Sequence, residues 1–416
     1  MGNIFKIALR NLTRYKRRTM LTSLLIIIGV CMVVLFSGLA GSFKNMMIGI
    51  ITDSSLGHIQ VHKKGYVSSI DTLPLNMNLK PKAYQKLEAV LLNQKGIEAY
   101  APRIKFGSML SNYAESTSVR ISAIAPDKER KVCTALHTRL KAEHDPATPL
   151  LKQGEVIIPE RIARAMKIEP GAPVVLVATN KDGSVNGMEF VVAGLIEDIL
   201  GPGGKDAYMH IDDARKLLRT KGAEVTEIVL RAKPGVPLKK VVMGLRKDLE
   251  GFLNKKGKPA FEVHTWEKLS PFSNIAGMID LMIITVKIIM IAIVLISVLN
   301  VMLMSVFERI REIGTIAAMG TLPSKILALF VAEGFLLGLL GTIAGLVLGL
   351  GGLLIVKAME ISFTFGRMPG LMLRPEINVS ELLIIGAIVL FASALAALQP
   401  AWKASKMEPV DALGHV

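Results

Sequence analysis

Motifs for nucleotide binding and hydrolysis are missing from this chain of 416 residues. It has no G-x-x-x-x-G-K-[ST] phosphate loop, no H-E-x-x-H zinc motif and no G-x-S-x-G nucleophile turn. The nearest glycine-rich stretch, GPGGKD at 201–206, lacks the spacing and the hydroxyl, so we expect an ordinary loop there. The sequence therefore offers no catalytic residue, and we expect neither an ATPase nor a hydrolase in this chain.

Cysteine is also scarce, and histidine is scattered. Cys31 lies in an apolar run and Cys133 in a polar segment, so the two are not expected to pair within one chain. Of the seven histidines, His58 and His62 are four residues apart and could face one side of a strand. A metal site would need at least one more ligand, so we expect none.

Acidic residues are absent from the first 20 positions, which carry six basic ones. The whole chain has a formal net charge of +16. Such charge suits nucleic acid, a membrane surface or an acidic partner. No helix-turn-helix, zinc pattern or aromatic-interleaved basic stripe accompanies it, so nucleic acid is not expected.

Long apolar runs are what the chain has in abundance. Hydrophobic residues make up 51% of the sequence and the mean hydropathy is +0.46, although 20% of residues are charged. A helix needs about 20 apolar residues to cross the membrane. Four runs of this length predict four transmembrane helices, at 20–40, 280–305, 326–356 and 382–401. The first run is longer than the apolar core of a signal peptide, so we favour an uncleaved anchor.

The basic N-terminal cluster sets the expected orientation. Positive charge stays on the cytoplasmic side, so four spans place both termini in the cytoplasm. The 225 or so residues between the first two spans then lie outside, as does 357–381. A long basic segment can still be translocated. We expect a multi-pass protein of the bacterial inner (plasma) membrane with a large periplasmic or extracytoplasmic domain.

Two charged residues fall inside predicted spans. Lys287 lies about two turns from the outer end of the second span, where it is expected to extend toward the interface. Glu333 lies two turns into the third span from the inner side. It could pair with Lys325 or the N-terminal cluster, or be protonated, and the sequence does not choose between these.

The third span also carries glycines at intervals of four residues, which line one helix face and allow another backbone to approach closely. We expect tight helix packing there, within the subunit or across a dimer. The residues are Gly334, Gly338, Gly341, Gly345 and Gly349.

Segment 51–275 has the composition of an aqueous α+β domain. Its order predicts β-α-β-β, then a strand-rich insertion at about 126–222, then β-α-β, with the outer pieces forming one layer. The expected strands are 58–61, 100–110, 118–124, 155–159, 172–178, 188–196, 225–232 and 260–266, and the expected helices are 81–94, 160–168, 212–219 and 237–253.

The stretch FERIREIGTIAAMGTLPSKI, residues 307–326, leaves the second span and enters the third on the cytoplasmic side. Charged residues (Glu308, Arg309, Arg311, Glu312) precede an apolar patch that includes Ile313 and Met319, and Gly320 and Pro323 end it. A short amphipathic helix at 307–325 could dock into a groove on a soluble motor. Alternatively, it could simply lie on the membrane surface.

This stretch resembles the coupling helix of FtsX-like/MacB-like permeases, whose usual form is close to E-R-x-R-E-I-G-x-x-x-A-x-G. The start ALRNLTRYKRRTMLT, the third span LFVAEGFLLGLLGTIAGLVLG and the close PAWKASKMEPVDAL also resemble that family. The resemblance implies an entry segment and first span at 1–50, a MacB-like domain with a ferredoxin-like layer at 51–275, and a permease domain at 276–416.

The resemblance further implies a mechanotransmission ABC system. Two copies of a separate ATPase subunit would bind ATP and magnesium, so this chain itself would need no cofactor. A second permease subunit, alike or different, would complete the assembly, with membrane lipid around it and a periplasmic adaptor or carrier as a further partner. Residues expected in the ATPase groove are Glu308, Arg309, Arg311, Glu312, Ile313 and Gly314, with Met319 and Gly320 closing the segment.

Two departures from the family bear on function. The macrolide-exporter relatives carry a fused ATPase that this chain lacks. One type of lipoprotein-releasing permease has a carrier-recruiting hook, and 197–211 leaves room here for only a short loop. Extraction or export of a lipoprotein or another hydrophobic substrate is the favoured function. The alternatives are a signalling subunit that switches an extracytoplasmic enzyme, and a membrane-anchored enzyme.

Overall fold

The computed structural model describes residues 2–14, 16–140, 149–197, 206–220, 222–254, 257–365, 368–373, 375 and 377–407. The chain divides into two compact units, Met47–Ile275 and a second that combines Met1–Met46 with Ala276–Val416. Most of the candidate hook loop (198–205) and the end of the C-terminal motif (408–416) lie outside the described residues.

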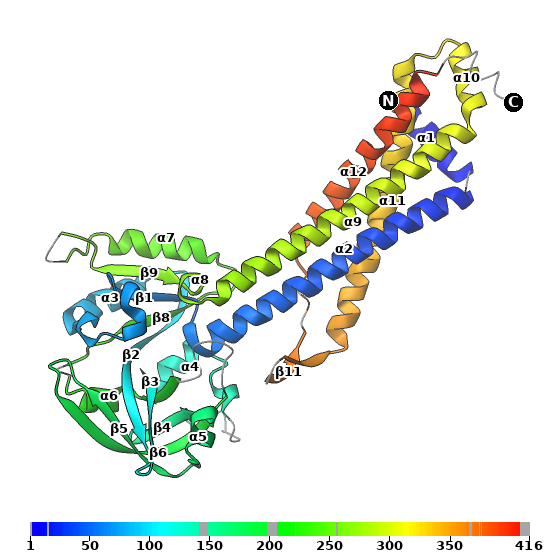
Figure 1. Ribbon diagram of the computed structural model, residues 1–416. Coiled ribbons are helices and arrows are strands. Elements are labelled where there is room, and N and C mark those ends of the chain that lie inside the picture. The colour runs from blue at the N-terminus through cyan, green and yellow to red at the C-terminus, as the bar shows by residue number, and fades with distance from the viewer. Residues whose placement is uncertain are drawn as a thin grey trace. The chain divides into compact units, whose positions relative to one another are not determined.

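Four helices of the second unit are long and apolar enough to cross a membrane (Figure 1). Each contains one predicted span. At 1.5 Å per residue, a helix of 36 residues extends about 54 Å, beyond the roughly 30 Å that the hydrocarbon requires. The helices are α1 (Gly2–Arg14), α2 (Lys16–Ile51), α9 (Phe272–Glu308), α10 (Ile310–Ala318), α11 (Pro323–Ala358) and α12 (Val379–Ser405), with a hairpin of β10 (Ser362–Phe365) and β11 (Met368–Met372).

The glycines of α11 lie where other helices of the same chain approach most closely. A Cβ added at Gly334 would stand 2.3 Å from the Cβ of Ala397, and one at Gly338 would stand 2.5 Å from that of Ser393, both on α12. Farther along the same face the neighbour is α2. A Cβ at Gly341, Gly345 or Gly349 would meet Ile26, Val30 and Val34 at 2.6–2.8 Å. These approaches are therefore within the subunit, and small residues make them sterically possible.

Lys287 has an acidic partner on another helix. Its ammonium forms an ion pair with Glu381 at the start of α12, and the Ser37 hydroxyl of α2 donates to the same carboxylate. About two turns before Lys287 on α9, Asp280 makes a second contact of this kind. Lys44 of α2 contacts both of its carboxylate oxygens at 2.6 Å. A partner on another helix explains the position, because it satisfies the ammonium without water.

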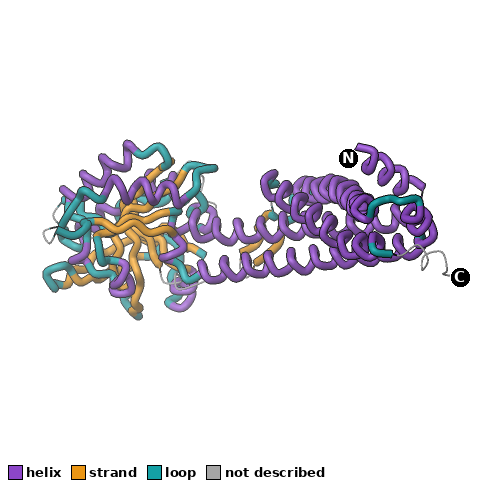
Figure 2. Tube along the Cα trace, turned by 90° about the horizontal axis from the view of Figure 1, so that it is seen from above, coloured by secondary structure: helices purple, strands orange, loops and turns teal. Residues whose placement is uncertain are grey.

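Residues Met47–Ile275 form a sheet flanked by helices, and the strands gather together in Figure 2. A π-helical turn, Thr52–Leu56, follows α2. The strands are β1 (Ile59–Lys63), β2 (Ile97–Ser111), β3 (Ser116–Ile124), β4 (Glu155–Pro159), β5 (Pro173–Thr179), β6 (Val185–Ile196), β7 (Asp206–His210), β8 (Glu227–Ala232) and β9 (Phe261–Thr265). The helices are α3 (Pro81–Asn93), α4 (Pro126–Val132), α5 (Glu160–Ala165), α6 (Ile211–Leu217), α7 (Leu238–Leu249) and α8 (Trp266–Leu269).

The strand order confirms the ferredoxin-like layer. Strands β2, β8, β1 and β9 are neighbours in that order and pair antiparallel, with α3 connecting β1 to β2 and α7 connecting β8 to β9. Apolar side chains from α3 and α7, among them Leu87, Leu91, Val241 and Leu245, pack with the strands in one core.

The insertion is built differently from the prediction. Each strand pairs with the next in the spatial order β2, β3, β7, β4, β6, β5. Strand β5 also pairs with β2, so these six strands close into a ring. Strand β3, expected in the first layer, therefore belongs to this ring, and β7 was expected as part of a loop. The cause is the 15-residue strand β2, whose residues 97–103 pair with β8 and whose residues 103–111 pair with β3.

Candidate functional site

The connection between α9 and α11 forms a short, sharply bounded helix. Arg309 interrupts the long helix with φ −116° and ψ 20°, and α10 then runs from Ile310 to Ala318. Gly320 has φ +83°, a left-handed conformation that glycine adopts without strain, and Pro323 stands in the first turn of α11. Local sequence thus explains both ends of α10.

A buried ion pair fixes the start of this helix. The Arg309 guanidinium donates from Nη1 to both carboxylate oxygens of Glu333, at 3.0 and 3.3 Å, and from Nε to Glu312 at 2.9 Å. It also lies 5.7 Å from the ring centre of Phe330. Asn11 of α1 donates to Glu333 at 2.6 Å. Three segments therefore meet at one carboxylate.

This arrangement identifies Arg309, rather than Lys325, as the partner of Glu333. Only 2% of the Glu333 side chain and 7% of the Arg309 side chain are exposed. A buried carboxylate needs such a partner, because an unpaired one loses its hydration without compensation. The sequence held a signal for this pair, since the two residues lie 11 and 13 positions from the turn at Gly320, on facing helices.

The predicted docking residues differ in their exposure. Arg309, Ile313 and Gly314 are buried and hold α10 against the helices. Glu312 is intermediate, and one of its oxygens lies 3.8 Å from Arg14 Nη1. The remaining four are exposed: Glu308, Arg311, Met319 and Gly320.

Two exposed apolar residues within 307–325 were not among the predicted docking residues. Phe307 and Leu322 are each 59% exposed, and Met319 is 73% exposed. Together with Glu308 and Arg311 they give α10 and its flanks a surface of mixed charged and apolar groups. Such a surface suits a protein groove, where apolar anchors are buried and charges at the rim give orientation.

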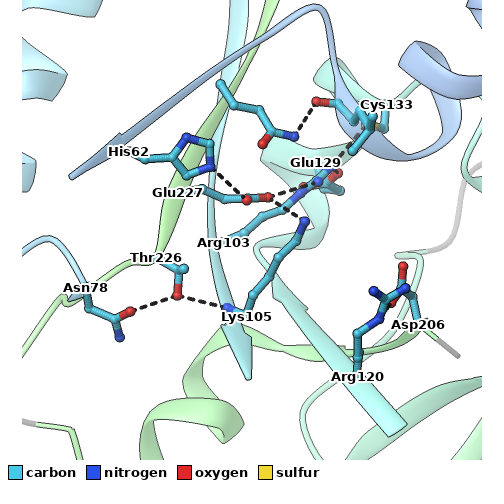
Figure 3. A network of polar contacts seen from close by, with 12 residues as sticks. His62, Asn78, Arg103, Lys105, Arg120, Glu129, Cys133, Asp206, Thr226 and Glu227 are labelled. Atoms are coloured by element: carbon cyan, nitrogen blue, oxygen red, sulfur yellow. Dashed lines mark hydrogen bonds and ion pairs between the residues drawn. The ribbon is translucent and has the colours of Figure 1, made fainter. Parts of the chain in front are cut away.

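A second polar cluster lies wholly within the sheet unit (Figure 3). Arg103 of β2 donates to both Glu129 oxygens and, at 3.4 Å, to Glu227. Lys105 Nζ stands 3.1 Å and His62 Nε2 3.3 Å from Glu227. Both carboxylates are fully buried. Burial alone would raise the pKa of Glu227, but Lys105, the His62 hydrogen bond and Arg103 outweigh it and hold that pKa far below its usual value.

This cluster has no reactive thiol. Burial, reinforced by Glu129, raises the pKa of Cys133 to about 12, so the sulfur stays protonated and inert. The two histidines of the predicted face serve different partners, since His58 Nδ1 accepts from the Ala232 N–H at 3.1 Å while His62 contacts Glu227. Within the described ranges, no three acidic, histidine or cysteine side chains are grouped as metal ligands.

Comparison with known proteins gives two family matches. Residues 19–247 match the MacB-like periplasmic core domain, and residues 284–409 match the FtsX-like permease C-terminal domain. A lipoprotein-releasing system transmembrane protein, LolC of Neisseria meningitidis serogroup B, is 24% identical over 84% of both chains. An uncharacterized ABC transporter permease of Methanocaldococcus jannaschii is 30% identical over 54% of this chain, which spans 55% of that relative's length.

Among solved structures, the periplasmic region of MacB from Actinobacillus actinomycetemcomitans is 16% identical. It covers 54% of this chain and 94% of its own, with a TM-score of 0.35. The first family match alone spans more than half of the chain, and the second covers the helices that carry α10. With its four membrane helices and its strand-rich extracytoplasmic domain, the chain belongs to the FtsX-like/MacB-like ABC transporter permeases.

Proposed function

We propose that this chain is the membrane subunit of an ABC transporter whose ATPase is a separate polypeptide, and that α10 is the helix that meets the ATPase. The observation that carries this is the two-sided construction of α10. Its inner side is fixed to α11 and α1 through Arg309, Glu333 and Asn11. Its outer side exposes Glu308, Arg311 and Met319. A helix held in this way would pass a push from the cytoplasm to the membrane helices.

In the proposed assembly, two ATPase subunits face two permease chains, and both termini of this chain lie in the cytoplasm. The residues of α10 and of its two flanks then have separate roles. Arg309, Ile313 and Gly314 position the helix, whereas Glu308, Arg311, Glu312, Met319 and Gly320 contact the ATPase.

The test is a charge reversal on the exposed side. The chain is co-expressed with its cognate ATPase, and complex yield and ATP hydrolysis are measured for Glu308→Lys combined with Arg311→Glu. We expect both to fall at least about tenfold, since charged rim contacts determine orientation and partner choice. The matched control is Glu160→Arg with Arg164→Glu, which reverses an ion pair on α5 whose arginine side chain is 70% exposed and whose glutamate side chain is 18% exposed. If the α10 variant retains normal complex and activity, the assignment of α10 is wrong.

We further propose that the cargo is a lipoprotein or another hydrophobic molecule taken from the outer side of the membrane. The likeness to LolC along most of both chains supports this. Crosslinking from the extracytoplasmic domain, followed by mass spectrometry, should recover lipidated protein or lipid. Recovery of a hydrolase with neither would favour the signalling alternative instead.

A further inference from the structure

A cavity of about 370 Å³ opens on the sheet unit beside the buried charge cluster. One wall comes from the face of β2, β3 and β7. The opposite wall comes from the segments that follow α2 (Ile51 to Leu56) and precede α9 (Leu269 to Phe272). This size is in the range of small-molecule sites, which combine apolar walls with a few converging polar groups.

Strand register explains why the polar groups of the first wall converge. Lys105 and Ser122 are direct partners across β2 and β3, and Arg120 lies two residues from Ser122 on the same face. Asp206 is the partner of Arg120 across β3 and β7. The side chains of Lys105, Ser122, Arg120 and Asp206 therefore share one face of the sheet, and Figure 3 shows Arg120 directed at Asp206.

The groups on this face are mainly hydrogen-bond donors. The Lys105 ammonium lies 3.1 Å from Oε1 of the buried Glu227, and 18% of the lysine side chain is exposed. Arg120 Nε lies 2.7 Å from Asp206 Oδ1, with 39% of the arginine side chain exposed. The carboxylate of Asp206 is thus already engaged, and the other carboxylate of the cavity, Asp71, is exposed to solvent. An ammonium, a guanidinium and a hydroxyl side by side fit an oxyanion.

The facing wall is mainly apolar, with Ser55 and Ser270 as its polar members. Ile51, Leu56, Leu269 and Phe272 contribute aliphatic and aromatic surface. Its first segment is held in place, since Asp53 within it accepts a 2.7 Å hydrogen bond from Arg231 on β8. A molecule that filled the cavity would touch a charged wall on one side and an apolar wall on the other.

We propose that this cavity binds a small anionic amphiphile, with its oxyanion head against Lys105 and Arg120 and its aliphatic part between Leu56, Leu269 and Phe272. The ligand class is a carboxylate or phosphate carrying an alkyl chain. A ligand bound there contacts both segments that join the domain to α2 and α9. Its affinity therefore depends on the distance between these two segments. This inference is independent of how α10 meets its ATPase.

Neutralising Asp206 and neutralising Arg120 should change the affinity for an anion in opposite directions. Burial raises the pKa of Asp206, although Arg120 and Lys105 oppose that shift. An anionic head group in the cavity would face this carboxylate as a like charge. Neutralising it removes a like charge from beside the ligand and should strengthen anion binding. Neutralising Arg120 should weaken it.

The experiment uses the full chain in nanodiscs of phosphatidylcholine. Trp402→Phe leaves Trp266, which begins α8 three residues before Leu269, as the only tryptophan. Its fluorescence is titrated with dodecanoate, dodecanol and dodecylammonium, and empty nanodiscs correct for partitioning into lipid. We expect a saturable change with dodecanoate alone, weakened about tenfold by Arg120→Gln and strengthened about threefold by Asp206→Asn.

The control is Lys181→Gln, which neutralises a cation of similar exposure (40%) paired with Glu224 elsewhere on the same domain. It should leave the titration unchanged. Equal binding of dodecanol, preferred binding of dodecylammonium, no saturation, or weaker binding by Asp206→Asn would each overturn the proposal. Asp206→Asn decides the matter even if Arg120→Gln fails to fold, because a gain of affinity requires a folded site. Phosphatidylglycerol in the disc, as competitor, then distinguishes a ligand drawn from the membrane from one drawn from solution.

Discussion

Glu227 and Glu333 show how single buried carboxylates organise both units of this permease. Each is almost fully buried and each is contacted by an arginine, and each joins segments far apart in the sequence. The sequence marked Glu333 as unusual because it interrupts an apolar run. It gave no such mark to Glu227, whose cationic partners on β2 lie about 120 residues away and become neighbours only through the register of β2 with β8.

The first prediction concerns Glu227→Gln. Removing this charge leaves Lys105 and Arg103 without one of their counter-ions in a buried site, so we expect a loss of about 3–5 kcal/mol in the unfolding free energy of the domain. Trp266 fluorescence in the Trp402→Phe background measures it during denaturant titration. The matched control is Glu224→Gln, which breaks the partly exposed pair with Lys181 and should cost less than Glu227→Gln, on the order of 1 kcal/mol.

The same residue predicts a pH dependence. The pKa of Glu227 is lower in the folded domain than its ordinary value of 4.5. Its contribution to stability is therefore complete well above pH 4.5 and is lost as the pH falls from there toward the folded pKa. The difference in stability between the native chain and Glu227→Gln should shrink as the medium is acidified below that value. A difference that stays constant from pH 7 to pH 3 would contradict the assigned ion pairs.

At the scale of elements, the sequence indicated the packing face of α11 but did not identify the helices that this face meets. The four-residue glycine spacing indicated close helix packing, and the structure places those glycines at close approaches. Spacing could not say which helix approaches, because one glycine face serves any partner. That face meets α12 through its first two glycines and α2 through the next three.

A pair of substitutions in α11 tests this packing. An added Cβ at Gly345 would stand 2.7 Å from the Val30 Cβ and 2.9 Å from the Ile27 carbonyl oxygen, whereas at Gly351 it would meet nothing within 4 Å. We expect Gly345→Ala to destabilise the purified protein by about 1–3 kcal/mol. Gly351→Ala should be neutral or stabilising by up to about 1 kcal/mol, since alanine favours the helix. Thermal unfolding in one detergent compares them, and equal effects would argue against the α2–α11 contact.

The sheet unit shows a different limit of prediction. Eight of its nine strands were expected near their observed positions, because alternating and β-branched residues mark them. Strand β7 was missed, since its five residues follow a Gly-rich stretch that suggested a loop. The closure of six strands into a ring was not predicted, because no local sequence pattern in β2 indicates that its two halves pair with different strands.

At the scale of the whole chain, hydropathy predicted the four spans and the large domain between the first two, and the basic N-terminus predicts the orientation. Orientation is open to a direct measurement. In a Cys31→Ser, Cys133→Ser background, single cysteines replace two exposed lysines, Lys95 in the sheet unit and Lys325 beside α10. A membrane-impermeant maleimide added to intact cells, with the outer membrane permeabilised where there is one, should label Lys95→Cys and spare Lys325→Cys.

Breaking the membrane should then expose Lys325→Cys to the same reagent, which serves as the control for reactivity. Labelling of Lys325→Cys in intact cells, or failure to label Lys95→Cys, would reverse the topology. It would also remove α10 from the side where ATP is available. Cargo identity and subunit pairing leave no comparable mark in the sequence, because they depend on surfaces contributed by other molecules.

Strand β2 also limits how this domain can be divided. Because the same 15 residues pair with β8 at one end and with β3 at the other, no linker separates the ferredoxin-like layer from the ring. A chimera that exchanges only the ring between relatives must therefore splice inside a strand and restore hydrogen bonds on both sides of the junction. A displacement of the ferredoxin-like layer should therefore be transmitted directly to the ring through the continuous backbone of β2.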